Sequence, residues 1–294
     1  MYKSDFMNSF TLLNTDYVQL DKNWHYNNIK SIFYRLYYID GGEGKLYNDT
    51  ETVTLEDGYL YLIPSFTTCN YECRSRLSQY YLQFMEGSAD GISLFAANRK
   101  IFKIPAGTED INCVKRILAL NPNRAIKTSY NPRDYEKSDI LMSYQDMNNL
   151  IPLSVFMETC GLLLQLLSRF MAAENFQIAE RKMIHPKVMD AINFIQTNLL
   201  TNITVEGLAQ RANQHPDYFS RLFLKNTGER PLAYVQLKRV ERAQLLLITT
   251  DLPFYKIAEE TGFESLSYLS RIFRNHTGQT LSDYKRQNLI SQSG

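Results

Sequence analysis

Residues 219–223 (FSRLF) and 269–273 (LSRIF) are two copies of one pattern, and a Thr-Gly pair follows each copy a few residues later. Corresponding residues lie 50 positions apart. A short helical pattern containing a small residue precedes each copy, at residues 208–209 and 257–258. Helix, tight turn and longer helix is the layout of a helix-turn-helix, so the sequence predicts this motif twice.

Each longer helix divides into two stripes, because residues three and four apart share a helix face. The inward stripes are mostly apolar: Phe219, Leu222, Phe223 and Asn226 in the first copy, and Leu269, Ile272 and Phe273 in the second. The opposite stripes are free to face a DNA groove. The candidate DNA-binding residues are Asp217, Ser220, Arg221, Lys225, Leu266, Ser267, Ser270, Arg271 and Arg274.

Residues 231–250, between the copies, form a third helical pattern, with Pro231 suited to its first turn. Twenty residues at about 1.5 Å each give a rod of roughly 30 Å. One turn of B-DNA is about 34 Å long. A rod of this length predicts that the two recognition helices reach successive major grooves on one side of the duplex.

Residues 184–288 resemble the DNA-binding domain of the AraC/XylS family of transcription regulators. The resemblance spans both motifs and the helix between them. Its matching residues include Ile203, Thr204, Leu208, Ala209, Tyr218–Phe223, Tyr234, Arg239, Ala243, Leu246, Leu247, Ile257, Ala258, Gly262, Phe263 and Tyr268–Phe273. The resemblance implies an all-α double helix-turn-helix that binds double-stranded DNA, with base contacts from Asp217, Ser220, Arg221, Leu266, Ser267 and Arg271. It also implies a regulator of transcription, more often an activator, with RNA polymerase as a further partner.

Four residues depart from the family pattern. His215 stands where a serine cap is frequent, and Leu224 stands where a lysine is common. Asp217 is repelled by phosphate but can accept a hydrogen bond from a cytosine amino group, whereas Leu266 offers only apolar contact, for instance to a thymine methyl. The resemblance therefore predicts the mode of binding and leaves the operator sequence open.

Charge contributes little to this interpretation. The formal net charge is +1 over 294 residues, divided into +3 from residue 184 onward and −2 before it. The length predicts two domains, and 44% hydrophobic residues are enough for ordinary cores. The DNA-binding prediction rests on the repeat.

The cysteines and the N-terminus indicate a reduced, cytoplasmic protein. Cys69, Cys73, Cys113 and Cys160 have no spacing typical of a disulfide framework or a zinc site, so we expect free thiols and no metal or cofactor. Residues 1–14 lack the basic flank and apolar run of a signal peptide, and no membrane span is expected.

The first half of the chain is rich in β-branched and aromatic residues. We predict strands over residues 31–39, 45–47, 52–55, 59–63 and 77–84, with turns at 40–44 and 56–58. Short antiparallel strands of this kind form sandwiches or barrels. Residues 86–108 give no clear pattern, and residues 1 to about 28 are interpreted as an N-terminal arm.

This stretch resembles the cupin-like jelly roll that precedes the DNA-binding domain in many members of the family. The resemblance rests on Gly42, Gly44, Leu55, Gly58, residues 62–64, Tyr71 and Tyr81. Cupin enzymes hold a metal with histidines, but no histidine lies between His25 and His185, and Cys69 stands at a usual histidine position. A metal-dependent enzyme is therefore not expected, and no Ser-His-Asp or Cys-His set suggests another catalytic activity.

Alternation along the strands predicts faces that could bind a small polar molecule, such as a sugar. The candidate effector-binding residues are Tyr34, Tyr38, Tyr71, Tyr81 and Gln83. The alternative is that these tyrosines are core residues and the domain is only a dimerisation scaffold. Arg35 points away from Tyr34 and Tyr38, where a structural ion pair is its expected role.

The middle of the chain predicts two helices. Residues 110–120 form the first, residues 121–149 are interpreted as turns and loose connection, and residues 153–171 carry apolar residues at helical spacing. That second helix either packs on its own sheet or forms a homodimer interface, as the resemblance implies. His185, His215 and His276 are expected to cap helices or contact solvent.

Together these inferences predict an α+β protein of two domains. Residues 1–175 form a cupin-like effector-binding and dimerisation domain, residues 176–185 a linker, and residues 186–294 the double helix-turn-helix.

Overall fold

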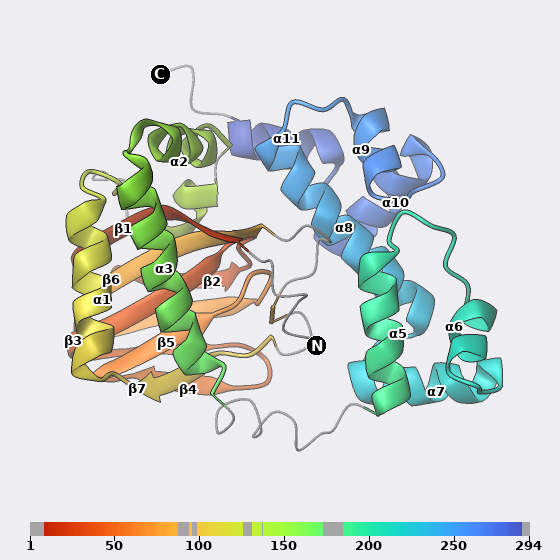
Figure 1. The fold of residues 1–294 in the computed structure, drawn as a ribbon, viewed down its shortest axis with the longest axis horizontal. Coiled ribbons are helices and arrows are strands. Elements are labelled where there is room, and N and C mark those ends of the chain that lie inside the picture. The colour runs from red at the N-terminus through yellow and green to blue at the C-terminus, as the bar shows by residue number, and fades with distance from the viewer. Residues whose placement is uncertain are drawn as a thin grey trace. The chain divides into compact units, whose positions relative to one another are not determined.

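The computed structural model describes residues 9–87, 94–95, 99–125, 131–136, 138–172 and 185–289. They form two compact units that divide at residues 177 and 178, outside the described residues. The first unit combines an antiparallel sheet with helices, and the described elements of the second are all helices (Figure 1). Of the predicted linker, residues 176–185, only His185 lies within the described residues.

Seven strands form the sheet in the order β1-β6-β3-β5-β7, with β2 also paired to β6 and β4 to β3. Their bounds are β1 Ser9–Asp21, β2 His25–Ile29, β3 Tyr34–Tyr47, β4 Thr52–Leu55, β5 Tyr59–Ile63, β6 Cys69–Gly87 and β7 Phe102–Pro105. Each pairing is antiparallel, as predicted. The jelly-roll topology stays a prediction.

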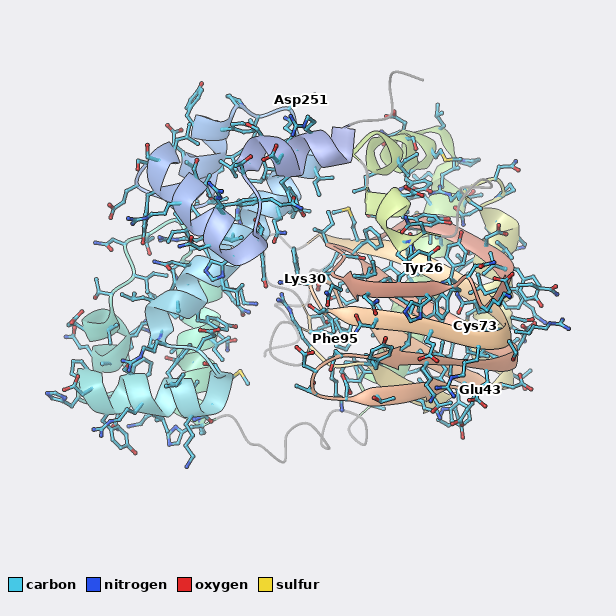
Figure 2. All side chains as sticks on the ribbon, turned by 180° about the vertical axis from the view of Figure 1, so that it is seen from behind. Tyr26, Lys30, Glu43, Cys73, Phe95 and Asp251 are labelled. Atoms are coloured by element: carbon cyan, nitrogen blue, oxygen red, sulfur yellow. The ribbon has the colours of Figure 1, made fainter. Side chains whose placement is uncertain are left out.

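Side chains alternate between the two faces of the sheet and build two cores. One face carries Tyr34, Leu36, Tyr38, Leu82 and Phe84 toward the helices. The other carries Tyr37, Ile39, Tyr71, Cys73, Leu77 and Tyr81, together with Trp24 and Ile29. Figure 2 looks onto this second side, with Tyr26 and Cys73 labelled.

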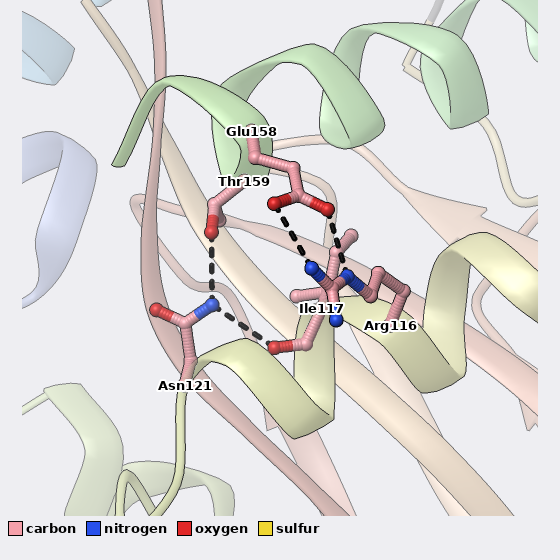
Figure 3. Close-up of polar contacts among 5 residues, drawn as sticks. All are labelled: Arg116, Ile117, Asn121, Glu158 and Thr159. Carbon is pink, nitrogen blue, oxygen red and sulfur yellow. Dashed lines mark hydrogen bonds and ion pairs between the residues drawn. The ribbon is translucent and has the colours of Figure 1, made fainter. Parts of the chain in front are cut away.

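Helices α1 (Thr108–Leu120) and α3 (Leu153–Phe170) lie across the first face (Figure 1). Two polar contacts join them at one point (Figure 3). Arg116 Nε is 2.7 Å from Glu158 Oε1, and buried Asn121 donates from Nδ2 to Thr159 Oγ1 at 2.9 Å and to the Ile117 carbonyl at 2.9 Å. The prediction of a helix from residue 110 to residue 120 is confirmed.

The apolar residues of α3 divide between two sides of the helix. Leu163, Leu166, Leu167 and Phe170 are buried in the core of the sheet. Leu153, Met157 and Leu164 are exposed by 72%, 64% and 37%. By length and composition alone α3 could cross a membrane, but Glu158 and Arg169 pair with Arg116 and Asp110 of this domain. One stripe therefore packs on the sheet, while the other is uncovered.

The structure corrects three predictions in this unit. Residues 40–44 are not a turn, because β3 continues to Tyr47 with irregular register around Gly42. Gly42 has φ +81° and lies against the carbonyl of Arg76, so these glycines form a bulge beside β6.

Residues 9–28 are not an arm, because β1 and most of β2 belong to the sheet. Residues 121–149 are not loose connection, because they include η2 (Pro132–Glu136) and most of α2 (Ser138–Leu150).

Backbone carbonyls of β1 hold this middle region in place. Arg124 Nη1 lies 3.3 Å from both the Leu12 and the Leu13 carbonyl, and Asn148 Nδ2 donates to the Leu12 carbonyl at 2.8 Å. Arg124 is 2% exposed. The middle of the chain is therefore anchored to the edge of the sheet.

The second unit contains α5 Pro186–Thr197, α6 Val205–Arg211, α7 Pro216–Thr227, α8 Pro231–Thr249, α9 Phe254–Glu260, α10 Leu266–Thr277 and α11 Leu281–Leu289. Two clusters form its core: α5 to α7 with the start of α8, and the rest of α8 with α9 to α11. The predicted repeat of short helix, turn and longer helix is confirmed as α6–α7 and α9–α10.

Candidate nucleic-acid interface and effector site

Helix α7 shows one face to solvent and buries the other. Phe219 and Phe223 are fully buried against α5, α6 and α8. Asp217, Arg221 and Lys225 are exposed and Ser220 is partly exposed. Asn226 anchors the helix end, because its Oδ1 accepts from the backbone N–H of His185 at 2.8 Å and its Nδ2 donates to the Leu222 carbonyl at 2.7 Å. The side chains left in solvent are the predicted DNA contacts of this helix.

Helix α10 repeats this division in the second motif. Leu269 and Phe273 are fully buried. Leu266, Ser267, Arg271 and Arg274 are exposed, and Ser270 is partly exposed. The nine predicted contact residues thus lie on outward parts of α7 and α10, five on the second helix and four on the first.

The two recognition helices end in the same way. Gly228 and Gly278 adopt the left-handed conformation, with φ +79° and +74°. Thr227 and Thr277 each donate to a carbonyl one turn earlier, that of Phe223 or Phe273, at 2.8 Å. Glycine takes this conformation without steric penalty, so the Thr-Gly pairs seen in the sequence are helix stops.

The starts of the helices differ. Ser265 caps α10 by accepting from the backbone N–H of Tyr268 at 3.2 Å. His215 occupies the cap position of α7 without a side-chain cap bond; it is exposed, and its Nδ1 is 3.9 Å from Asp217 Oδ2. His185 caps α5 through Nδ1, which accepts from the backbone N–H of Lys187 at 3.3 Å, and His276 is exposed.

Both arginines of the outward stripes are oriented by neighbours. The Arg271 guanidinium lies 5.2 Å from the ring centre of Tyr268, whose hydroxyl accepts from Gln236 Nε2 at 2.6 Å. Arg221 Nε donates to the carbonyl of Asp217 at 3.3 Å. An arginine held in this way loses less freedom when its planar donors meet a guanine edge.

Arg239 of α8 connects the two motifs. Its Nε donates to the Leu199 carbonyl at 2.9 Å and its Nη2 to the Thr201 carbonyl at 2.8 Å, both between α5 and α6. Its guanidinium also lies 5.8 Å from the ring centre of Phe263, in the turn of the second motif. One side chain of the 19-residue helix α8 thus contacts both halves of the domain.

A hollow of about 470 Å³ runs beside α10 and ends at the start of α11. It is lined by Phe254, Leu266, Ser270, Arg271, Arg274, Asn275, Thr280, Leu281 and Ser282. Asn275, Thr280 and Ser282 were not among the predicted contact residues. Their polar character was visible in the sequence. Asn275 follows Arg274 within α10, whereas Thr280 and Ser282 line this hollow because of how the start of α11 folds.

Three comparisons bear on this arrangement. Residues 208–287 match the family described as a helix-turn-helix domain. The arabinose operon regulatory protein of Salmonella typhimurium is 32% identical over 130 residues, which cover 42% of this chain and 44% of that protein. The lactose operon transcription activator of Staphylococcus xylosus is 30% identical over 102 residues, which cover 35% and 37%. Among solved structures, ToxT of Vibrio cholerae matches 96% of this chain and all of that chain, at 13% identity and a TM-score of 0.47.

This chain carries an AraC-type DNA-binding domain. The matched part spans less than half of the length of either operon regulator. By name, both relatives regulate operons and neither is an enzyme. The described helices of the AraC-type domain, α5 to α11, include the whole matched segment.

N-terminal to the AraC-type domain, the sheet divides the predicted effector-binding residues between its faces. Tyr34 and Tyr38 lie in the core facing α1 and α3, where Tyr34 stacks on Phe84 at 5.2 Å. Tyr71 and Tyr81 lie in the opposite core. The predicted residues therefore lie on two faces of the sheet, because alternate side chains along β3 and β6 point to opposite faces. Their role in effector binding stays a prediction.

Tyr81 and Gln83 border a small cavity of about 30 Å³ on this second face. Its other lining residues are Val18, Leu20, Trp24, Tyr37, Gln79, Pro132 and Tyr135. The Tyr81 hydroxyl donates to Asn14 Oδ1 at 3.2 Å, and its ring packs edge-on to Tyr135 at 6.2 Å. Space of this size holds about one water molecule. A larger ligand would have to displace a lining side chain, and Tyr135, which comes from η2 outside the sheet, is the candidate.

Several buried polar atoms near this cavity have no hydrogen-bond partner among the described residues. They are Asn14 Nδ2, Gln79 Oε1, Arg124 Nη2 and Tyr144 Oη. Buried polar atoms are usually paired, so such a group calls for an explanation, for which a bound polar molecule is one candidate. Tyr135 and Tyr144 were not predicted, because they lie in η2 and α2, where strand alternation gives no information.

Arg35 lies deep in the first unit, with 1% exposure. Its Nη2 donates to the Thr67 carbonyl at 2.8 Å and its Nη1 donates to the Tyr71 hydroxyl. As predicted from alternation, it points away from Tyr34 and Tyr38.

The four cysteines are free in the structure. Burial raises the pKa of Cys69 to about 11, against a smaller opposite effect of Arg35, so this thiol is neutral at physiological pH. Among the described residues, no three His, Cys, Asp or Glu side chains gather as metal ligands would.

Proposed function

We propose that this protein is a sequence-specific DNA-binding transcription regulator. The observation that carries the proposal is the pair of outward faces on α7 and α10, whose residues repeat at an offset of 50. Arg239 of α8 links the two halves of the domain that hold these helices. The match to an arabinose regulator and a lactose activator supports activation as the outcome. Double-stranded DNA is the first partner, RNA polymerase a further one, and the cytoplasm the location.

The test is binding of the full-length protein to DNA from its own upstream region, compared with random DNA at several salt concentrations. Arg221→Ala and Arg271→Ala should each weaken specific binding by about 1 to 3 kcal/mol and relax the sequence preference. Arg74→Ala, which removes an exposed cation from the first unit, is the matched control and should leave binding unchanged. Equal loss of affinity for all DNA would instead make either arginine a phosphate contact.

The second part of the proposal is that a small polar molecule, such as a sugar, binds on the second face of the sheet near Tyr81, Gln83 and Gln79. The unpaired amide and hydroxyl groups near the cavity support this site. A ligand changes DNA binding only by favouring one arrangement of the protein over another. Tyr135→Ala should open the cavity and tighten binding of a true effector, whereas a ligand whose heat is unchanged by this substitution binds elsewhere.

The third part is a homodimer formed through the exposed stripe of α3, Leu153, Met157 and Leu164. Contiguous exposed apolar residues commonly mark interaction surfaces. A protein whose sheet serves only as this dimerisation scaffold is the alternative function. It would bind its operator selectively with no heat or thermal shift from any metabolite of a broad panel.

A further inference from the structure

Helix α8 passes from one hydrophobic core of the AraC-type domain into the other. Tyr234 and Val235 pack in the core of the first half, α5 to α7, whereas Val240 and Ala243 pack in the core of the second half, α9 to α11. Among the described residues, the two cores have no member in common. Each half is thus held together by its own core. The placement of one half relative to the other depends on α8 and on the contacts around residues 236–239, the turn between the cores.

Arg239, in this turn, binds the backbone of the first half. Its Nε and Nη2 donate to the carbonyls of Leu199 and Thr201, and both nitrogens belong to one rigid planar group, so the two bonds fix its orientation. The same guanidinium lies 5.8 Å from the ring centre of Phe263 in the second half. Arg239 is partly buried and Thr201 is exposed, so water can replace these bonds when the side chain is changed. A substitution of Arg239 can therefore loosen the contact without unfolding either half.

The backbone makes a further contact between the halves at this point. Gly262 lies against the carbonyl oxygen of Leu199, with no room for a β-carbon between them. This oxygen is the one that accepts from Arg239 Nε. The Arg239 side chain and the Gly262 backbone thus hold one carbonyl from two sides, and we call this set of contacts the seam.

The seam continues to a predicted DNA contact. Gln236 Nε2 donates to the Tyr268 hydroxyl at 2.6 Å, and the ring of Phe263 packs edge-on to Tyr268 at 5.7 Å between centres. The Arg271 guanidinium lies 5.2 Å from the centre of the same Tyr268 ring. Contacts therefore run without a break from the carbonyls bound by Arg239, through two aromatic rings, to the arginine of the second recognition helix.

We infer that Arg239 is a positioning residue that sets which spacing of two DNA half-sites the protein accepts, an inference that rests on the proposed function. Two joined reading surfaces reinforce each other only where the geometry lets both bind at once. One base pair inserted between the half-sites moves the second by about 3.4 Å and turns it by about 35°. A rigid seam cannot follow this displacement. A loosened seam can follow it, but it must then be ordered on binding, which lowers the affinity.

The probe for the test is DNA selected from a random pool by the full-length wild-type protein. Footprints of Arg221→Ala and Arg271→Ala on this DNA show which half-site α7 reads and which α10 reads. Affinity is then measured on the selected DNA and on versions with one or two base pairs inserted or removed between these half-sites. We expect a single insertion to weaken binding of the wild-type protein about tenfold or more.

Arg239→Met removes the donors and keeps an apolar stem of similar length. It should bind the selected DNA several-fold more weakly than wild type, while the loss caused by a single insertion falls to about threefold or less. Arg239→Lys keeps the charge but replaces the planar group with one ammonium, so it should relax the spacing in the same direction. Arg239→Lys also decides the matter if Arg239→Met does not fold, which the melting temperature of each variant shows.

Arg230→Met is the matched control, because it removes an exposed cation from the cap position at the start of α8. It should keep the spacing dependence of the wild type, whatever it does to affinity. Unchanged spacing dependence in the folded Arg239 variants would overturn the inference, and so would wild-type protein that binds every spacing equally well. Selective binding by the wild type would leave the proposed function standing in both cases. Wild-type protein that prefers no DNA sequence would overturn the proposed function, and this inference with it.

Discussion

Gly262 lies directly against the backbone carbonyl of Leu199, so the turn of the second helix-turn-helix is seated on the chain between α5 and α6. Gly262 has φ +78°, and a β-carbon at this position would overlap the Leu199 oxygen. The same oxygen accepts from Arg239 Nε at 2.9 Å. The contact between the two motifs is therefore made by backbone as well as by side chain.

Gly262→Ala should destabilise the DNA-binding domain by about 3 kcal/mol, because left-handed backbone strain is added to a steric overlap that backbone atoms cannot relieve. Gly278→Ala is the control, since Gly278 has φ +74° but open space around its α-carbon. It should cost about 1 kcal/mol from strain alone. Urea denaturation of both variants measures the difference between their free energies of unfolding. Equal midpoints would show that the contact with Leu199 does not contribute to stability.

A second comparison concerns the two contacts between α1 and α3 in Figure 3. Asn121 and Thr159 are 2% and 3% exposed, whereas the Arg116 and Glu158 side chains are 54% and 42% exposed. Asn121→Ala removes two buried hydrogen bonds and should cost about 1 to 3 kcal/mol. Arg116→Ala should leave the urea midpoint close to wild type, because water screens the ion pair. A larger loss from Arg116→Ala than from Asn121→Ala would reverse this ranking.

The C-terminal half could be predicted from sequence because its signals are local. The inward positions of α7 and α10 follow helical spacing, and Gly228 and Gly278 end both helices in the left-handed conformation that glycine permits. What the sequence did not indicate is that Arg239 would join the motifs, since its acceptors are carbonyls 40 and 38 residues away.

The sheet was harder to predict because its pattern depends on what covers each face. In β1, Leu12, Leu13, Asn14 and Thr15 are all buried, so no alternation marks the strand, and its register with β6 shifts between Leu12 and Asn14. The alternating pattern of each strand shows which of its residues share a face. It does not show how the faces of β3 and β6 correspond, and in the structure Tyr34 and Tyr81 lie on opposite faces of the sheet.

Buried tyrosines predict a loss of stability at alkaline pH. Burial raises the pKa of Tyr37 to about 12, against smaller opposing effects of Arg35 and Tyr71, and burial also raises the pKa of Tyr71 and Tyr81. In unfolded chains a tyrosine ionises near pH 10. The folded state thus binds more protons above pH 10, and the stability that is present below pH 10 is lost as the pH rises toward 12.

Urea denaturation between pH 8 and pH 11, followed by circular dichroism, measures this loss. Each such tyrosine adds up to about 1.4 kcal/mol per pH unit to the slope. Tyr37→Phe should make the slope shallower above pH 10. Ionisation of these tyrosines near pH 10 in a protein that remains folded would contradict the assignment.

The exposed stripe of α3 predicts how the proposed dimer could be broken without unfolding the protein. Met157 and Leu164 lie on one side of the helix, and Leu163 and Phe170 lie in the core on another. Met157→Glu with Leu164→Glu places two charges on the stripe and none in the core, so the melting temperature of the sheet domain should barely change while an apolar interface becomes unfavourable. Sedimentation equilibrium should show a monomer.

Gln165→Glu, exposed beside the stripe, is the charge control and should stay dimeric. Wild-type protein that is already monomeric at micromolar concentration would contradict the proposed interface. A double variant that still dimerises would place the interface on another surface.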